Sequence, residues 1–251
     1  MYGSELAEIF DQIYAARGKD YRTEAEEIAG RVRSHLPGAA SLLDVACGTG
    51  AHLSAFAEIF DRVEGLELSE PMIETARRRL PGVRIRAGDM RDLDLGTRFD
   101  AITCLTGSIG YLTTTEELDA ALLRFARHLN PGGVVAIDPW WFLETFRPGY
   151  VSGDVVTVAG RTIARVSHSA LEGNASRMHV HYVVAEAAAG ARHFMEDHLI
   201  TLFTRKEYEA AFTRAGLAVS YVEGVQSGRG LFLGVLTGAD PAAGAVTRED
   251  T

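Results

Sequence analysis

The stretch DVACGTG at residues 44–50 carries the residue types best suited to binding a small cofactor. Asp44 ends an apolar, strand-like stretch, and Gly48 and Gly50 let the backbone approach a ligand without a Cβ in the way. Glu67 ends the next such stretch, 17 residues after Gly50, where its carboxylate can accept both hydroxyls of a ribose. The Asp44 carboxylate suits a ligand with a cationic amino-acid end. The pattern therefore predicts a site for a mononucleoside-type cofactor.

Two other classes of nucleotide site are excluded by what this turn lacks. A dinucleotide fingerprint, G-x-G-x-x-G, needs a third glycine for close packing of the helix on the strand, and position 53 is Leu. No P-loop lysine follows the glycines, and the turn carries none of the basic residues that a pyrophosphate favours.

Strands and helices alternate on either side of this turn. Apolar positions at helical spacing predict helices over 5–15 and 22–36 before it. Expected strands then alternate with expected helices, which predicts a parallel sheet with helices on both faces and all carboxyl strand ends along one edge. The expected strands cover 42–46, 63–68, 83–88, 99–105 and 134–138, and the expected helices cover 52–60, the segment opening at Ser69, and 116–129.

The pattern changes after Trp141. Only strand-like stretches occur between about 150 and 203, separated by glycines, which predicts an antiparallel unit of hairpins. A helix over 204–215 and strands over 217–223 and 230–236 complete the chain. We expect an N-terminal helical lid at 1–36, an α/β core at 37–149, the β insertion at 150–203, completion of the core at 204–238 and a disordered tail at 239–251.

Composition limits the partners of the chain. It has 25 Lys and Arg against 34 Asp and Glu, a net charge of −9, and no basic run, which argues against nucleic acid and anionic membrane surfaces. A local basic pocket for one small anion remains possible. Two cysteines in no metal-ligand spacing, a start without a signal-peptide pattern and the lack of an 18-residue apolar run favour a cytoplasmic location without a disulfide framework.

Three features together resemble the class I S-adenosylmethionine (SAM)-dependent methyltransferases: DVACGTG, the strand-end Glu67 and Gly88-Asp89-Met90. The resemblance implies a doubly wound α/β fold whose seven-stranded sheet ends in an antiparallel strand. It also implies that the Asp89 carboxylate binds the adenine amino group and that the Met90 amide meets an adenine ring nitrogen. The cofactor-binding residues that we expect are Tyr21, Asp44, Ala46, Gly48, Gly50, Glu67, Leu68, Met72, Asp89, Met90 and Leu105.

A narrower resemblance covers nearly the whole chain. GKDY at 18–21, PWWF at 139–142 and SGRGLF at 227–232 are similar to the dTDP-amino-sugar N,N-dimethyltransferases of macrolide antibiotic biosynthesis. This resemblance implies two SAM-dependent methylations of the amine of a dTDP-linked deoxysugar, and it also suggests a homodimer. Two alternatives stay open: a class I methyltransferase for another small amine or a hydroxyl, and a catalytically silent SAM-binding partner protein.

A sugar nucleotide needs a cation for its diphosphate. Arg229, between two glycines on an expected open loop, is a candidate because a guanidinium binds phosphate oxygens in a bidentate way. Trp140 and Trp141 follow the fifth strand at the ligand edge and can line a sugar or base pocket, although core packing would also explain them.

The inserted strands offer further substrate contacts. Arg165, Ser167 and Ser169 have the same parity on one strand and can face a cleft together. His181 is a weaker candidate. It shares a face with His179, but no third ligand completes a metal site, and we expect no metal.

Tyr2 and Tyr111 are the expected catalytic residues. The resemblance places a tyrosine at the position of Tyr2 near the transferring methyl, and Tyr21 at the methionine end of SAM. Family members carry a histidine directly after the motif SIG, where this chain has Tyr111. The reacting amine resembles an α-amino group with a pKa near 7.7–8.0, so roughly a tenth is neutral at pH 7 and no strong base is required. We therefore assign Tyr2 and Tyr111 to orientation and proton relay.

Overall fold

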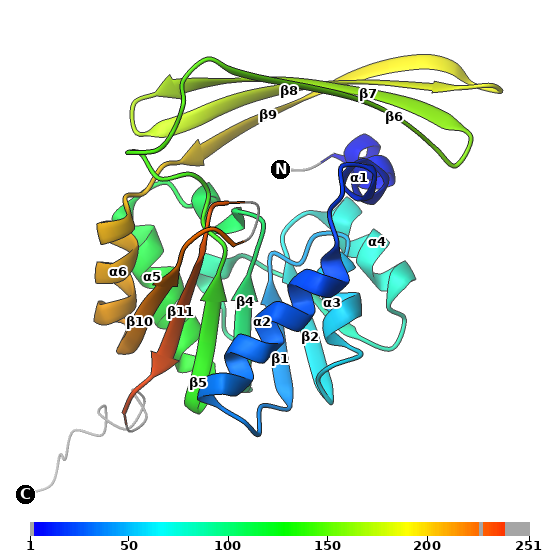
Figure 1. Ribbon diagram of the computed structural model, residues 1–251. Coiled ribbons are helices and arrows are strands. Elements are labelled where there is room, and N and C mark those ends of the chain that lie inside the picture. Colours follow the sequence, from blue (N-terminus) through cyan, green and yellow to red (C-terminus); the bar gives the residue numbers. More distant parts are fainter. Residues whose placement is uncertain (1–2, 226–227, 239–251) are drawn as a thin grey trace, which may run out of the picture.

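The computed structural model describes residues 3–225 and 228–238, arranged as two sheets one above the other (Figure 1). The lower sheet has seven strands in the order β10-β11-β5-β4-β1-β2-β3, and the upper sheet has four in the order β6-β7-β8-β9. The predictions for Tyr2 and for the tail at 239–251 concern residues outside the described part.

The lower sheet has the strand order expected for a class I methyltransferase. All its neighbouring strands pair in parallel except β11, which is antiparallel to both β5 and β10. The doubly wound α/β prediction is therefore confirmed. Its strands are β1 (Ser41–Val45), β2 (Arg62–Glu67), β3 (Arg84–Ala87), β4 (Phe99–Cys104), β5 (Leu129–Ile137), β10 (Leu217–Val222) and β11 (Leu231–Leu236).

Helices cover both faces of this sheet, so its central strands β1 and β4 are buried on each side. One face packs against α2 (Tyr21–His35), α3 (Ala51–Phe56) and α4 (Glu70–Arg79). The other packs against α5 (Thr115–Arg127) and α6 (Arg205–Arg214), whose N-terminus is fixed by a capping box between Thr204 and Glu207. In the described part of the chain no helix is long and apolar enough to cross a membrane.

The start of β5 differs from the prediction. The sequence Pro131-Gly132-Gly133 is typical of a turn, so we expected the strand to begin at Val134. In the structure β5 begins at Leu129, because Leu129 pairs with Phe99 and the register then shifts before Val134 pairs with Ala101. The turn-like residues form an irregularity inside the strand rather than its boundary.

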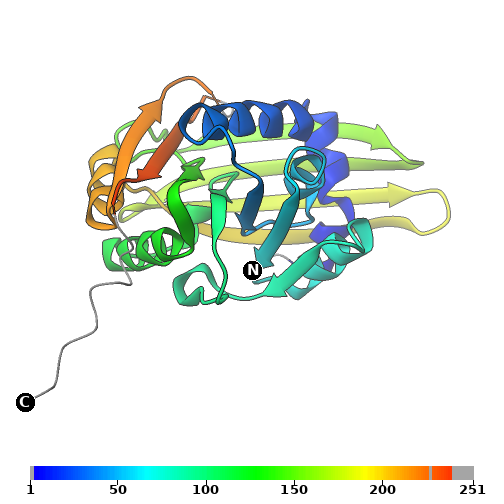
Figure 2. The same ribbon diagram turned by 90° about the horizontal axis from the view of Figure 1, so that it is seen from below.

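The four-stranded sheet forms a cover over the carboxyl edge of the lower sheet, and Figure 2 shows its long strands extending across the width of the molecule. Its inner face packs on α1 (Ser4–Ala16), with Leu6, Ile9 and Ile13 against side chains that include Ile163 and Val180. Its neighbouring strands pair antiparallel, which confirms the expected antiparallel unit. Its strands are β6 (Tyr150–Val158), β7 (Arg161–Glu172), β8 (Ala175–Glu186) and β9 (Gly190–Thr201).

Candidate active site

Two cavities meet between the carboxyl edge of the lower sheet and the four-stranded sheet above it. The first has a volume of about 300 Å³ and the second about 750 Å³. Phe10, Tyr21 and Thr106 line both cavities. Because they share these walls, a ligand in one cavity lies next to a ligand in the other.

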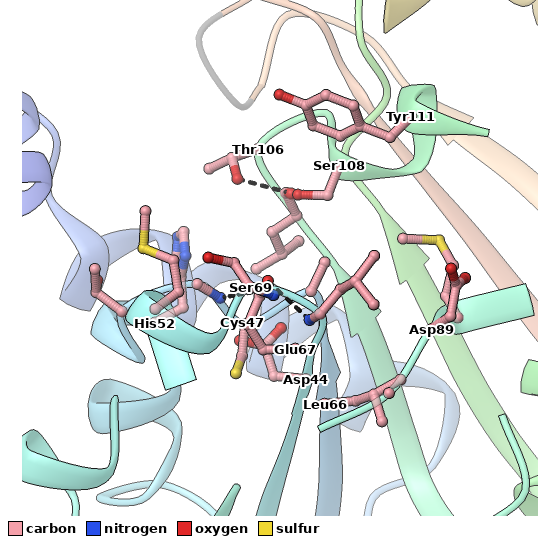
Figure 3. Close-up of a pocket in the computed structure, with 18 of the residues that line it drawn as sticks. Asp44, Cys47, His52, Leu66, Glu67, Ser69, Asp89, Thr106, Ser108 and Tyr111 are labelled. Carbon is pink, nitrogen blue, oxygen red and sulfur yellow. Dashed lines mark hydrogen bonds between the residues drawn. The ribbon is translucent and has the colours of Figure 1, made fainter. Parts of the chain in front are cut away.

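The first cavity is built around two strand-end carboxylates (Figure 3). Asp44 is buried at the end of β1 and accepts a hydrogen bond from Thr103 Oγ1 at 2.7 Å. Glu67 ends β2 and accepts from the backbone N–H groups of Gly48 (2.8 Å), Leu68 (2.9 Å) and Ser69 (2.8 Å). A carboxylate has about four lone-pair sites, so Glu67 is held firmly and can still accept from a ligand.

Asp44 makes the wall of this cavity acidic. Burial raises the pKa of its carboxyl to about 6, and the charge of His52 and the Thr103 hydrogen bond oppose that rise. Among the described residues no Lys or Arg forms an ion pair with it. An unpaired buried carboxylate is costly, so a cationic ligand would be stabilised here.

Asp89 follows β3 and is already paired. Arg91 donates to both of its oxygens, at 3.0 Å from Nε and 2.6 Å from Nη2, and lowers the pKa of Asp89. Arg91 also bonds Glu117 of α5 at 2.9 Å. Sequence reasoning missed Arg91, although its place two residues after Asp89 was a usable signal. Asp89 still lines the cavity, where it retains acceptor capacity.

The two glycines of the turn have different surroundings. Gly48 has a φ of +56° and lines the cavity, with nothing within 4 Å of where its Cβ would be. Gly50, with a φ of +76°, does not line it: its Cβ would lie 3.2 Å from Ala76 Cβ and 3.3 Å from Leu80 Cδ1 of the α4 segment. This corrects the expectation that Gly50 makes room for a ligand. The missing side chain makes room for α4 instead. The other expected residues that line the first cavity are Tyr21, Ala46, Leu68, Met72, Met90, Leu105 and Tyr111.

The second cavity gathers basic side chains from separate segments. Its lining includes Arg17, Lys19, Arg147, Arg165 and Arg229. The net-negative chain thus contains a local basic pocket. A group of cations around one cavity is suited to an anionic ligand.

Arg165 is the most unusual of these cations, because it is only 6% exposed. Its Nη1 donates to Ser167 Oγ at 3.1 Å, while its Nε is buried with no hydrogen-bond partner. Within the described ranges no carboxylate forms an ion pair with it. Ser167 and Ser169 share the inner face of β7 with Arg165 and also line the cavity, as their parity predicted.

Arg229 is placed differently from the expectation of an open-loop arginine. Its side chain is only 12% exposed and pairs with the fully buried Asp138, with Nη2 at 2.8 Å from Oδ2. Nε also donates to the Pro139 carbonyl at 3.0 Å, and the guanidinium lies 5.4 Å from the Trp140 ring centre. Burial raises the pKa of Asp138, and Arg229 counters that rise. The missed residue here is Asp138, which carries the same strand-end signal as Asp44.

The two tryptophans and the histidine that we expected to contact the substrate differ in where they lie. Trp140 and Trp141 both line the second cavity. His181 does not: it lies on the outer face of the four-stranded sheet, stacked on His193 with ring centres 5.3 Å apart. Its neighbours Val180 and Tyr182 face inward, so the alternation of β8 turns His181 away from both cavities. This corrects the expectation that His181 contacts the substrate.

A partly buried network that sequence reasoning missed lies where the two cavities join. Lys19 bonds Glu24 at 2.7 Å, and Glu24 bonds His52 Nε2 at 2.8 Å. Tyr21 packs edge-on against His52, with ring centres 4.8 Å apart. Hydrogen bonds from His52 and Lys19 lower the pKa of Glu24 against the opposing effect of burial. The network fixes the ring of Tyr21 between the cavities.

Known proteins are similar to this chain in sequence and fold. The methyltransferase-domain family model matches residues 42–133. A dTDP-3-amino-3,4,6-trideoxy-alpha-D-glucopyranose N,N-dimethyltransferase of Streptomyces venezuelae is 59% identical, over 94% of this chain and 99% of that protein. A dTDP-4-amino-2,3,4,6-tetradeoxy-D-glucose N,N-dimethyltransferase of Saccharopolyspora spinosa is 50% identical, over 94% of each chain.

A solved methyltransferase structure is also similar to this chain. It is SAM-bound CalS10, an amino pentose methyltransferase of Micromonospora echinaspora, which is 51% identical with a TM-score of 0.85 over 91% of this chain and 97% of that one. With identity of this level over almost its whole length, the chain belongs to the family of dTDP-amino-sugar N,N-dimethyltransferases.

Proposed function

We propose that this protein binds SAM in the first cavity and a dTDP-linked amino deoxysugar in the second, and transfers two methyl groups to the sugar amine. The observation that carries the proposal is Arg165, a buried guanidinium with an unpartnered Nε beside a cavity of about 750 Å³. The acidic first cavity adjoins it, so a cationic and an anionic ligand have neighbouring sites. Incubation with SAM and a dTDP-amino sugar, followed by mass spectrometry, tests the proposal.

The first cavity fits SAM, which supplies a methyl group on a cationic sulfur that an amine lone pair can displace. Asp44 is proposed to bind the ammonium of the methionine end, with Tyr21 beside it, and Glu67 the ribose hydroxyls. Asp89 and Met90 are proposed to hold the adenine ring. Gly48 leaves room for the ligand because no side chain fills its position.

The second cavity fits a nucleoside diphosphate. We assign the diphosphate to Arg165, with Ser167 and Ser169 beside it on the same face of β7. Arg147, which is exposed and forms no ion pair with any described residue, can approach from the cavity mouth. Arg229 is less suited to bind phosphate alone, because Asp138 already neutralises its charge. Trp140 and Trp141 offer flat surfaces to the thymine or the sugar.

The chain contributes alignment rather than a strong base. An amine with a pKa near 7.7–8.0 is partly neutral at pH 7, and its lone pair can react without a dedicated acceptor for its proton. Positioning two reactants is worth several kcal/mol in itself. The four-stranded sheet and α1 cover the site and limit the access of water.

We also propose that the reacting amine is at C3 of the sugar. The support is the higher identity to the relative named for a 3-amino sugar, 59%, than to the relative named for a 4-amino sugar, 50%. Both positions are included in the test of turnover.

A homodimer is proposed through the outer face of the four-stranded sheet, where large apolar side chains are exposed. Val166 and Met195 are 51% and 50% exposed and flank His181 in one cross-strand row. We expect the double variant Val166→Lys/Met195→Lys to be monomeric in light scattering where the wild type is dimeric, since two buried ammonium groups would be costly. Monomeric wild-type protein at the same concentration would contradict this proposal.

A further inference from the structure

The hydroxyl of Tyr111 is linked to a buried histidine of the other sheet. Tyr111 ends the 3-10 turn η2 (Ser108–Tyr111) after β4, and its ring extends over the first cavity above Ser108 and Thr106 (Figure 3). His198 lies on the inner face of β9, with its Nδ1 at 2.9 Å from the Tyr111 hydroxyl. The two rings meet edge-on, with centres 6.2 Å apart.

We propose that His198 is a positioning residue for methyl transfer: its Nδ1 accepts the Tyr111 proton, so that the Tyr111 oxygen presents its lone pairs to an N–H of the substrate amine. This inference rests on the proposed function. Tyr111 is the group that touches the substrate, and His198 acts only through it.

The protonation state of His198 is compatible with this direction of the hydrogen bond. The residue is 5% exposed, and burial lowers the pKa of its imidazole to about 4. It is therefore neutral near pH 7, and a neutral imidazole has one ring nitrogen that accepts. The same shift makes His198 a poor final acceptor for the proton of an amine with a pKa near 8. The pair orients the amine, and the proton leaves to water.

An acceptor at this place also limits the number of methyl groups. In each transfer the amine lone pair forms the new N–C bond, the methyl–sulfur bond breaks with its electron pair left on sulfur, and the product ammonium gives a proton to water. A neutral primary amine has two N–H groups and its monomethyl product has one, so both can donate to Tyr111. The neutral dimethyl product has none. The pair therefore favours two transfers and does not orient a third.

The test is a double-mutant cycle with Tyr111→Phe and His198→Phe, measured with SAM and the dTDP-amino sugar. Loss of one neutral hydrogen bond is expected to lower kcat by about 10-fold in each single variant, with KM for the sugar changed by less than about twofold. Both transfers should slow, so the monomethylated intermediate should persist for longer than with the wild type. The double variant is expected to be no slower than the single variants, because both remove the same interaction.

Two further variants separate positioning from packing. His198→Asn keeps an acceptor near the place of Nδ1 and is expected to restore most of kcat, whereas His193→Phe, on the outer face of β9, should leave kcat unchanged. Additive effects in the cycle, or equal loss in His198→Asn and His198→Phe, would overturn the role of His198. Wild-type protein that transfers no methyl to any dTDP-amino sugar would instead overturn the proposed function, and this inference with it.

Discussion

Replacing Arg165 with Met is expected to raise the Tm of the ligand-free protein and, at the same time, to weaken dTDP binding by about 10- to 100-fold. The first effect follows because a buried guanidinium without an ionic partner costs about 1–3 kcal/mol or more, and Met fills similar space without charge. At roughly 2–4 °C per kcal/mol for a chain of this size, the change is measurable by thermal unfolding. The second follows from losing charge-assisted hydrogen bonds worth about 1.5–3 kcal/mol.

Arg161→Met is the matched control. Arg161 lies on the same strand with the same parity, but it pairs with Glu8 at 2.9 Å and with Glu186 at 3.0 Å. Its loss should lower Tm, because Glu186 loses its cation and Glu8 keeps only Arg192, and should leave dTDP affinity unchanged. Titration calorimetry with dTDP, together with the Tm shift produced by SAM, checks both variants. If Arg165→Met lowered Tm like Arg161→Met and kept its dTDP affinity, Arg165 would have a structural role only.

Replacing Asp44 with Asn is expected to weaken SAM binding by about 10- to 100-fold. The side chain keeps its size, but its oxygen loses the charge that a cationic group would meet, and hydrogen bonds to charged groups are worth about 1.5–3 kcal/mol. Asp61→Asn removes the same charge from an exposed position outside both cavities and should leave the affinity unchanged. Equal SAM affinity of Asp44→Asn and wild type would contradict the assignment of Asp44.

The pH dependence gives a second readout at the same residue. Because burial raises the pKa of Asp44 to about 6, its carboxylate is ionised above that pH and protonated below it. SAM affinity should therefore be level at neutral pH and should fall as pH drops below about 6, by up to about tenfold per pH unit. Asp44→Asn has no proton to gain and should show a flat profile over that range. A wild-type profile that stayed flat down to about pH 5 would contradict this account.

Much of the site could be predicted because local patterns determine it. The carboxyl ends of parallel strands must share one edge, so Asp44 and Glu67 come together once their strands are recognised. Side-chain parity likewise placed Arg165, Ser167 and Ser169 on one face.

What could not be predicted depends on pairing between distant segments. Asp138 and Arg229 are 91 positions apart, and Tyr111 and His198 are 87 apart in different sheets. The alternation of side chains along a strand also shows which residues share a face, but it does not show which of the two faces is covered. On β8 both faces carry apolar residues, since Val180 is buried and Val183 is exposed, so the outward position of His181 needed the structure.

Mass spectrometry of the products formed from SAM and paired dTDP-3-amino and dTDP-4-amino deoxysugars tests the central claim most directly. We expect a gain of two methyl masses on the 3-amino sugar, with a monomethyl species that appears first and disappears. Two methyl groups on the 4-amino sugar alone would keep the activity and overturn the proposed amine position. No transfer to either sugar, by protein that still binds SAM, would contradict the proposed function.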